Sequence, residues 1–415
     1  MGALRILHVA PYFEHAWAYG GIPRVVSAQA HALAAAGHHV TVATTDARDG
    51  GTRTSAAGGE TSRRLASRHE RTADGIDVRV FPNLSNAAAY HGQFFLPLGF
   101  AGWLGAHARD FDVAHLHACH NLLTAVAAKH LHRAGIPYVV QPNGTARRIE
   151  RRRAAKWVFD TLFERGVLRN AAGIIAVTQC ERRQIQELGY LGSEDPGLQQ
   201  EPWVVPNPLA PLPSCCMPER GWFRERLGLT HGPLLMYLGT LSPRKQPDML
   251  ARAAAALARP DVQLVFAGND MGEERAVRRI VRRLGLEPRT RFTGLLTGPA
   301  RYAALAAADV VVYPSYGEVF GLVPLEALQA GTPVIVSNDN GCGEIIGEIG
   351  GGLLVAPGNP ALLAAAAGKI LDSLPRWRVA AAQAGAEASR RFHPNAVAAR
   401  LDEVYREVIA RAGRS

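Results

Sequence analysis

Two glutamates separated by seven residues, Glu318 and Glu326, stand in the part of the sequence with the most distinct chemistry. An apolar run ending at Tyr313 predicts a strand, and Gly321 marks the predicted start of a helix that contains Glu326. Free N–H groups at a helix start bind phosphate or sugar oxygens. A carboxylate in the second helical turn would repel a phosphate, so both glutamates are predicted to accept hydrogen bonds from vicinal hydroxyls. A solvated helix glutamate is the alternative for each.

Two adjacent cations, Arg244 and Lys245, lie between a predicted strand and a predicted helix. The strand is Leu234–Leu238, and Gly239 follows at its carboxyl end. A positioned Arg/Lys pair stabilises negative charge that develops on a leaving phosphate, and it does so without a metal. Ordinary surface charge is the alternative for this pair.

The segment 314–334 resembles the E-x7-E motif of the retaining glycosyltransferases of family 4, here as E-V-F-G followed by E-A-x-x-x-G-T-P-V. The resemblance implies that Glu318 holds the donor sugar and Glu326 the donor ribose. The preceding segment is similar to the family's G-R-x-x-x-x-K element, with Lys245 on the lysine and Thr240 in place of the arginine. Arg244 would then have to supply the second charge. The implied site has Arg244, Lys245 and Glu318 as catalytic residues, and Gly239, Val319, Phe320, Gly321, Leu322 and Glu326 as donor-binding residues.

The acceptor side is expected near the amino terminus, where Tyr19-Gly20-Gly21 precedes a predicted helix. Glycines let backbone approach a ligand, and the pattern is similar to the family's glycine-rich loop, which faces the donor phosphate and the acceptor. A plain tight turn is the alternative. At Asn143 the family often carries a histidine or arginine, so no imidazole base is expected here. The resemblance implies retention without an enzyme base, because the leaving phosphate can assist the incoming hydroxyl.

Metal ligands are not expected at the site, and no cofactor is expected, because a nucleotide-sugar is a substrate. His115 and His117 alternate along a predicted strand, as in the family's D-V-x-H-x-H strand, but with no third ligand nearby they do not make a metal site. Asp110 and Asp112 match the letters of a D-x-D metal motif. They precede the strand at its amino end, away from any ligand-binding edge, and are predicted to be structural.

Strands and helices alternate along the whole chain, which predicts parallel sheets covered on both faces. We expect an α/β protein of the GT-B fold, with two doubly wound Rossmann-like domains facing across a cleft. Asp46–Asp74 is predicted to be a mobile loop. The proline-rich stretch after Val205 predicts the linker. The predicted boundaries are 1–206 for the acceptor-side domain, 207–394 for the nucleotide-sugar domain, and 395–415 for a final helix with the first domain as a candidate packing partner.

The chain has 415 residues, a net charge of +10 and five cysteines without zinc-ligand spacing. No signal peptide or membrane-spanning run is apparent, and no nucleic-acid-binding signature accompanies the positive charge. One predicted helix carries a basic stripe beside Trp157 that suits anionic lipid headgroups or a phosphorylated lipid acceptor. A solvated face is the alternative for this stripe, which consists of Arg148, Arg151, Arg152 and Lys156.

The resemblance therefore predicts a metal-independent, retaining hexosyltransferase-type enzyme that moves a sugar from a nucleotide-sugar to a glycan or lipid-linked acceptor. Its expected setting is polysaccharide or glycolipid biosynthesis in the cytoplasm, with the inner face of a membrane as a candidate location. Two rivals stay open: a nucleotide-sugar epimerase of similar build, and a catalytically silent nucleotide-sugar-binding subunit. Acceptor-dependent release of nucleoside diphosphate separates a transferase from both.

Overall fold

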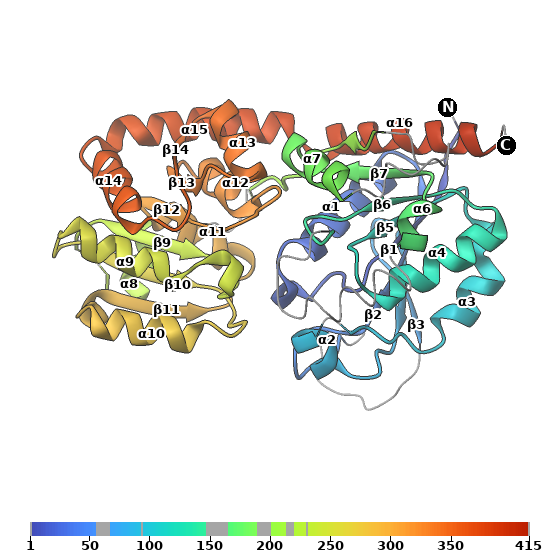
Figure 1. Cartoon of the computed structure of the whole chain (residues 1–415), viewed down its shortest axis with the longest axis horizontal. Helices are drawn as coiled ribbons and strands as arrows, with labels where there is room; N and C mark the ends of the chain where they lie inside the picture. The colour runs from blue at the N-terminus through green and yellow to red at the C-terminus, as the bar shows by residue number, and fades with distance from the viewer. Residues whose placement is uncertain are drawn as a thin grey trace. The chain divides into compact units, whose positions relative to one another are not determined.

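The chain forms two compact units, Met1–Pro208 with Pro394–Ser415, and Leu209–His393. A computed structural model describes residues 2–54, 67–92, 94–146, 165–188, 201–212, 220–229 and 231–413. Each unit is built around its own sheet and carries its own buried apolar clusters (Figure 1).

The N-terminal unit contains an eight-stranded sheet in the order β3-β4-β2-β1-β5-β6-β7-β8. All neighbouring strands are parallel except β3 and β4, which pair antiparallel. The central strands are fully buried or nearly so, as expected for a sheet covered on both faces. The strands are β1 (Arg5–Val9), β2 (His39–Thr45), β3 (Arg68–Arg71), β4 (Asp77–Phe81), β5 (Val113–His117), β6 (Tyr138–Gln141), β7 (Gly173–Ala176) and β8 (Trp203–Val204).

Helices cover both faces of this sheet, because alternate strand residues enter two different clusters. Ile6 packs with α1 and α16, whereas its neighbour Leu7 packs with α3 and α4. The last helix, α16, thus lies against α1 and the unit in which the chain begins (Figure 1). The helices are α1 (Ile22–Ala35), α2 (Asn86–Gly92), α3 (Phe100–His107), α4 (Leu122–Ala134), α6 (Arg165–Arg169), α7 (Gln179–Glu187) and α16 (Pro394–Ala412), with short 3-10 helices at Trp17–Tyr19 and Ala108–Asp110.

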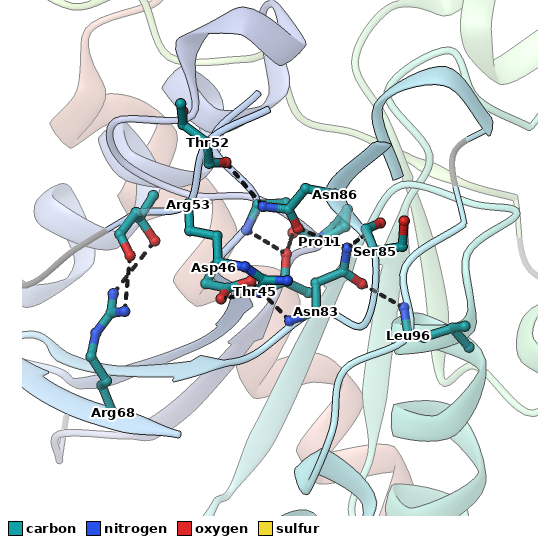
Figure 2. Close-up of polar contacts among 12 residues, drawn as sticks. Pro11, Thr45, Asp46, Thr52, Arg53, Arg68, Asn83, Ser85, Asn86 and Leu96 are labelled. Carbon is teal, nitrogen blue, oxygen red and sulfur yellow. Dashed lines mark hydrogen bonds and ion pairs between the residues drawn. The ribbon is translucent and has the colours of Figure 1, made fainter. Parts of the chain in front are cut away.

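The segment after β2 is fastened by Asp46, a buried carboxylate (Figure 2). Its Oδ1 accepts a hydrogen bond from the backbone N of Asn83 at 2.8 Å, and its Oδ2 lies 2.5 Å from Nη1 of Arg53. The Asn83 side chain in turn accepts a bond from Leu96 N at 2.8 Å and donates to Asn86 Oδ1 at 3.0 Å (Figure 2). The loops after β2 and β4 are therefore joined by one buried polar network.

The prediction of a loop over Asp46–Asp74 is wrong for Arg68–Arg71, which form strand β3. Residues 46–54 are held by the Asp46 network, and β3 (Arg68–Arg71) forms the edge of the sheet. This edge strand is made of charged and polar residues, with Glu70 paired to Arg68 at 2.9 Å. Charged side chains are typical of edge strands, and they hide the strand from apolar patterning. Residues 55–66 lie outside the described part.

The C-terminal unit contains a six-stranded, fully parallel sheet in the order β11-β10-β9-β12-β13-β14. One face packs on α9, α10 and α14 through a cluster that includes Tyr237, Phe266 and Val312. The strands are β9 (Leu234–Leu238), β10 (Gln263–Ala267), β11 (Thr290–Gly294), β12 (Val310–Tyr313), β13 (Val334–Ser337) and β14 (Gly352–Val355). The helices are α8 (Arg220–Arg226), α9 (Asp248–Leu257), α10 (Glu274–Arg283), α11 (Gly298–Ala307), α12 (Leu322–Gln329), α13 (Gly341–Ile349), α14 (Pro360–Leu371) and α15 (Leu374–Arg391), with 3-10 helices at Pro243–Lys245 and Glu287–Arg289.

Candidate active site

The carboxyl ends of β9 and β12 lie next to each other, because the two strands are parallel neighbours. From β9 the chain continues to β10 on one side, whereas β12 lies on the other side, so the strand order reverses here. Open α/β sheets bind their ligands at such reversal points. The segments 239–246 and 314–321 follow these two strands, and they carry most of the predicted site residues.

Lys245, Glu318 and Tyr313 form a hydrogen-bonded cluster at this edge. The Nζ of Lys245 donates to Tyr313 Oη at 2.6 Å and pairs with Glu318 Oε2. Tyr313 Oη donates to the same carboxylate oxygen at 2.8 Å. The side chains of Lys245 and Glu318 are only 12% and 10% exposed. The structure therefore brings together two predicted catalytic residues that are 73 positions apart in the chain.

The charges in this cluster act strongly on one another. Burial alone would raise the pKa of Glu318, but the positive charges of Lys245 and Arg244 and the hydrogen bonds from Lys245 and Tyr313 lower it to about 2. Burial lowers the pKa of Lys245, and the negative charge of Glu318 opposes that effect. Glu318 is consequently a carboxylate at neutral pH and can only accept hydrogen bonds.

Helix α12 begins at Leu322, four residues after Glu318, and Gly321 caps its start. This residue has a φ of 79°, and a Cβ added to it would lie 2.5 Å from Cys342 Sγ, so only glycine fits. Val319 and Phe320 are buried just before it, and the ring of Phe320 packs edge-on against Phe392 with centroids 5.2 Å apart. The start of α12, at Leu322, is thereby presented at the carboxyl end of β12.

Asn340 braces the loop that carries Glu318. Its Nδ2 donates to the backbone carbonyl of Ser315 at 2.9 Å, and its Oδ1 caps α13 by accepting from Gly343 N at 3.0 Å. The next residue, Gly341, donates its N–H to the backbone carbonyl of Glu318 at 2.8 Å. Nothing in the sequence indicated this role, because Asn340 follows a different strand.

Glu326 pairs with Arg301, a cation of α11 that the sequence did not single out. The Nε of Arg301 donates to Glu326 Oε2 at 3.0 Å, and its Nη2 pairs with the same oxygen. Both residues are buried, at 7% and 5% exposure. The only sequence signal for Arg301 is a cation within a helix of otherwise apolar and small residues. The guanidinium at the end of this long side chain fixes one oxygen of Glu326, the carboxylate that the resemblance implies holds the donor ribose.

The turn after β9 places Gly239 and Thr240 at the same edge. Gly239 N donates to Ala267 O at 2.9 Å, and Tyr237 Oη donates to Thr240 O at 2.7 Å. The backbone of Thr240 is therefore fixed by a fully buried tyrosine. Arg244 lies four residues further on. Its positive charge lowers the pKa of Glu318, and only the charge of Lys245 lowers it more.

Gly20, Gly21 and Asn143 belong to the N-terminal unit. Gly20 has a φ of 96°, and Gly21 caps the start of α1. From α1, Gln29 Nε2 donates to Gln141 Oε1 at 3.1 Å, and Gln141 Nε2 donates to Asn143 Oδ1 at 3.3 Å. The predicted acceptor-side loop and Asn143 are thus linked through α1.

Asp112 is a structural residue, at the amino end of β5. Its Oδ2 accepts from Arg5 N, and its Oδ1 pairs with Arg5 Nη2, both at 2.7 Å. The prediction that His115 and His117 have no third ligand nearby is wrong, because His8 of β1 lies directly opposite His115. The stripe Arg148, Arg151, Arg152 and Lys156 lies outside the described residues. No helix in the described part is both long enough and apolar enough to span a bilayer.

Two family models together match most of the chain: "Glycosyl transferase 4-like domain" over residues 20–194 and "Glycosyl transferases group 1" over residues 222–387. The chain is 30% identical over 329 residues to D-inositol 3-phosphate glycosyltransferase of Corynebacterium aurimucosum, covering 77% of this chain and 72% of the relative. It is 32% identical over 266 residues to the enzyme of the same name from Thermobispora bispora, of which it spans 60% while 61% of this chain is covered.

Solved structures show the same fold at low sequence identity. HepE of Anabaena, in complex with UDP and glucose, matches 97% of this chain and 100% of its own with a TM-score of 0.72 and 20% identity. Sucrose-phosphate synthase of Thermosynechococcus elongatus matches 98% and 99% with a TM-score of 0.73 and 21% identity. The two parallel-sheet units therefore have the GT-B fold. The chain belongs to family 4 of the glycosyltransferases.

Proposed function

We propose that the chain transfers a sugar from a nucleotide-sugar donor to an acceptor hydroxyl with retention of anomeric configuration, and that the transfer needs no metal. The observation that carries this proposal is the buried Lys245–Glu318–Tyr313 cluster at the point where the strand order of the C-terminal unit reverses. Such an edge suits a nucleotide, and the cations beside it suit a leaving pyrophosphate.

In the proposed reaction the bond from C1 of the sugar to the donor phosphate breaks, and a bond from C1 to the acceptor oxygen forms. Lys245 has three donor positions, of which Tyr313 and Glu318 use two, so the ammonium can also meet a phosphate oxygen. Together with Arg244 it would stabilise charge on the departing phosphate. The proton of the acceptor hydroxyl passes to that phosphate on the same face of the sugar, which gives retention.

Glu318 and Glu326 would hold the donor by accepting from its hydroxyls, on the sugar and the ribose respectively. The lowered pKa of Glu318 supports this role, because a carboxylate that stays ionised remains an acceptor. HepE is described with UDP and glucose, which supports a nucleotide-sugar donor. A glycan or lipid-linked acceptor stays our proposal. The name of the relatives adds D-inositol 3-phosphate as a compound to test.

Donor selection is tested first, by thermal shift with UDP-, GDP- and ADP-sugars, since a bound ligand raises stability by mass action. The donor so found is then incubated with each acceptor, and free nucleoside diphosphate is measured. Acceptor-dependent release and a product of unchanged anomeric configuration, assigned by NMR, are expected. Release without acceptor together with an altered sugar would indicate an epimerase, and binding without release a silent subunit. Turnover that stops within minutes of adding EDTA would contradict transfer without a metal.

A further inference from the structure

Three histidines meet on one face of the N-terminal sheet. His8 of β1 is directly opposite His115 of β5 in the strand register, and His117 follows two residues later on the same face. The ring centroids of His115 and His117 are 4.1 Å apart. The ring centroid of His8 lies 5.2 Å from that of His115 and 5.1 Å from that of His117. All three side chains have 0% exposure.

The hydrogen bonding of these rings is incomplete. Nδ1 of His8 lies 2.9 Å from Nε2 of His117, and Nδ1 of His115 lies 2.7 Å from Oη of Tyr405 in α16. Within the described part of the chain the other three ring nitrogens have no partner: Nε2 of His8, Nε2 of His115 and Nδ1 of His117. Buried polar atoms in native proteins are nearly always bonded, so the unmet Nε2 of His115 beside the His8–His117 pair points to an occupant.

We propose that His8, His115 and His117 form a binding site for one divalent transition metal, of the class of Zn²⁺, in the core of the N-terminal unit. Two histidines at alternate positions of one strand and a third on the adjacent strand supply three nitrogen ligands within 4.8 Å of one another. Imidazole nitrogen favours Zn²⁺ and its neighbours in the first row over Mg²⁺ or Ca²⁺, which prefer oxygen. The site is separate from the proposed donor site and does not depend on it.

The rings need only a small movement to close on an ion. Zn–N bonds of about 2.0–2.1 Å place two ligand nitrogens about 3.3 Å apart at a tetrahedral angle. Nδ1 of His8 and Nε2 of His117 are already 2.9 Å apart, so a metal held by these two nitrogens and by Nε2 of His115 would take the place of the proton that the first two rings share. Tyr405 would act as a positioning residue, because accepting the Nδ1–H of His115 leaves Nε2 of that ring free.

The rival occupant is a buried water, which also makes two to four hydrogen bonds to unmet polar atoms. Since the cluster is closed to solvent, the metal must enter as the chain folds. The full chain is therefore unfolded with a chelator, refolded with or without Co²⁺, and desalted. We expect about one Co²⁺ retained per chain, visible d–d absorption, and X-ray absorption that fits about three nitrogens at 2.0–2.1 Å. A refolded wild-type chain without retained Co²⁺ would leave water as the occupant and overturn the proposal.

Variants assign the ligands. His8→Gln and His117→Gln should each lose the retained Co²⁺ and the rise in melting temperature that it gives the wild type. His38→Gln is the matched control: His38 is a largely buried histidine that also faces α16, through Asp402 at 3.4 Å, but lies outside the cluster. Tyr405→Phe should keep the metal with an affinity about 10- to 100-fold weaker. Equal metal loss in the His38→Gln chain, or metal retained in both ligand variants, would contradict the assignment. Where a ligand variant does not fold, the X-ray absorption of the wild type decides.

Discussion

At the residue scale, each of the two predicted glutamates is held by its own cation. Glu318 is paired with Lys245, and Glu326 with Arg301, and all four side chains are at most 12% exposed. Removing one partner of a buried pair leaves an uncompensated charge, which costs more than the pair itself contributes. Substitutions at these positions therefore have to be tested for folding as well as for activity.

Lys245→Ala should lower turnover by roughly ten- to a thousandfold, because the ammonium acts on charge that develops at the leaving phosphate. The measurement is kcat with saturating donor, with circular dichroism to verify folding. Lys369→Ala, at an exposed lysine of the same unit, is the control and should keep full activity. Undiminished kcat in Lys245→Ala would assign the charge stabilisation to Arg244 alone.

Glu318 should make stability depend on pH in acid. Its pKa falls from 4.5 to about 2 on folding, so its carboxylate stabilises the fold above pH 4.5 and this contribution is lost as pH falls towards 2. The free energy of unfolding of wild type and Glu318→Gln should therefore converge between these two pH values. A constant difference across the range would mean that Glu318 has the same pKa in the folded and unfolded chain.

Arg301→Met should destabilise the C-terminal unit by about 3–5 kcal/mol, since it leaves Glu326 buried and unpaired. The double variant Arg301→Met/Glu326→Leu should recover most of this loss in denaturant unfolding.

Glu326→Ala should weaken donor binding by about 1–3 kcal/mol, as expected for an unpaired polar partner. Unchanged donor affinity in Glu326→Ala would remove this residue from the donor site.

At the element scale, patterns of apolar residues were enough to place most strands and helices near the site. The strand Leu234–Leu238 has the predicted bounds, and the strand before Glu318 ends at Tyr313 as predicted. The edge strand β3 was missed because its residues are charged. Contacts between elements could not be predicted either: nothing local places His8 beside His115 or Arg301 beside Glu326. Such pairings depend on how strands and helices that are distant in the chain are arranged in space, and local patterns in one sequence do not predict that arrangement.

Asn340→Ala tests how α13 supports the Glu318 loop. It should cost about 0.5–2 kcal/mol as a lost helix cap, and it should also lower kcat because Ser315 loses its brace. Asn359→Ala is the control: Asn359 caps α14 in the same way, with bonds to Ala361 N and Leu362 N, but does not contact the loop. Equal kcat in the two variants would mean that the loop holds its shape without Asn340.

At the scale of the whole molecule, the net charge of +10 favours anionic surfaces. The stripe Arg148, Arg151, Arg152 and Lys156 could contribute about 1 kcal/mol per cation near an anionic membrane. We expect sedimentation with anionic but not neutral vesicles, lost at high salt and lost when these four residues become glutamine. A matched variant with four exposed arginines of α10 replaced by glutamine controls for net charge; these are Arg275, Arg279, Arg282 and Arg283. Equal loss in both variants would refute a specific role for the stripe.

The return of α16 to the first unit has a consequence for biosynthesis. Leu401, Val404, Tyr405 and Val408 of this helix are at most 2% exposed, in a cluster with residues of β1 and α1. A ribosome makes these residues only after it has made the whole of Leu209–His393. Domains generally fold in the order of their synthesis, but here the unit that is started first is the last to be completed. Until α16 emerges, the part of this sheet face that α1 does not cover stays open to aggregation.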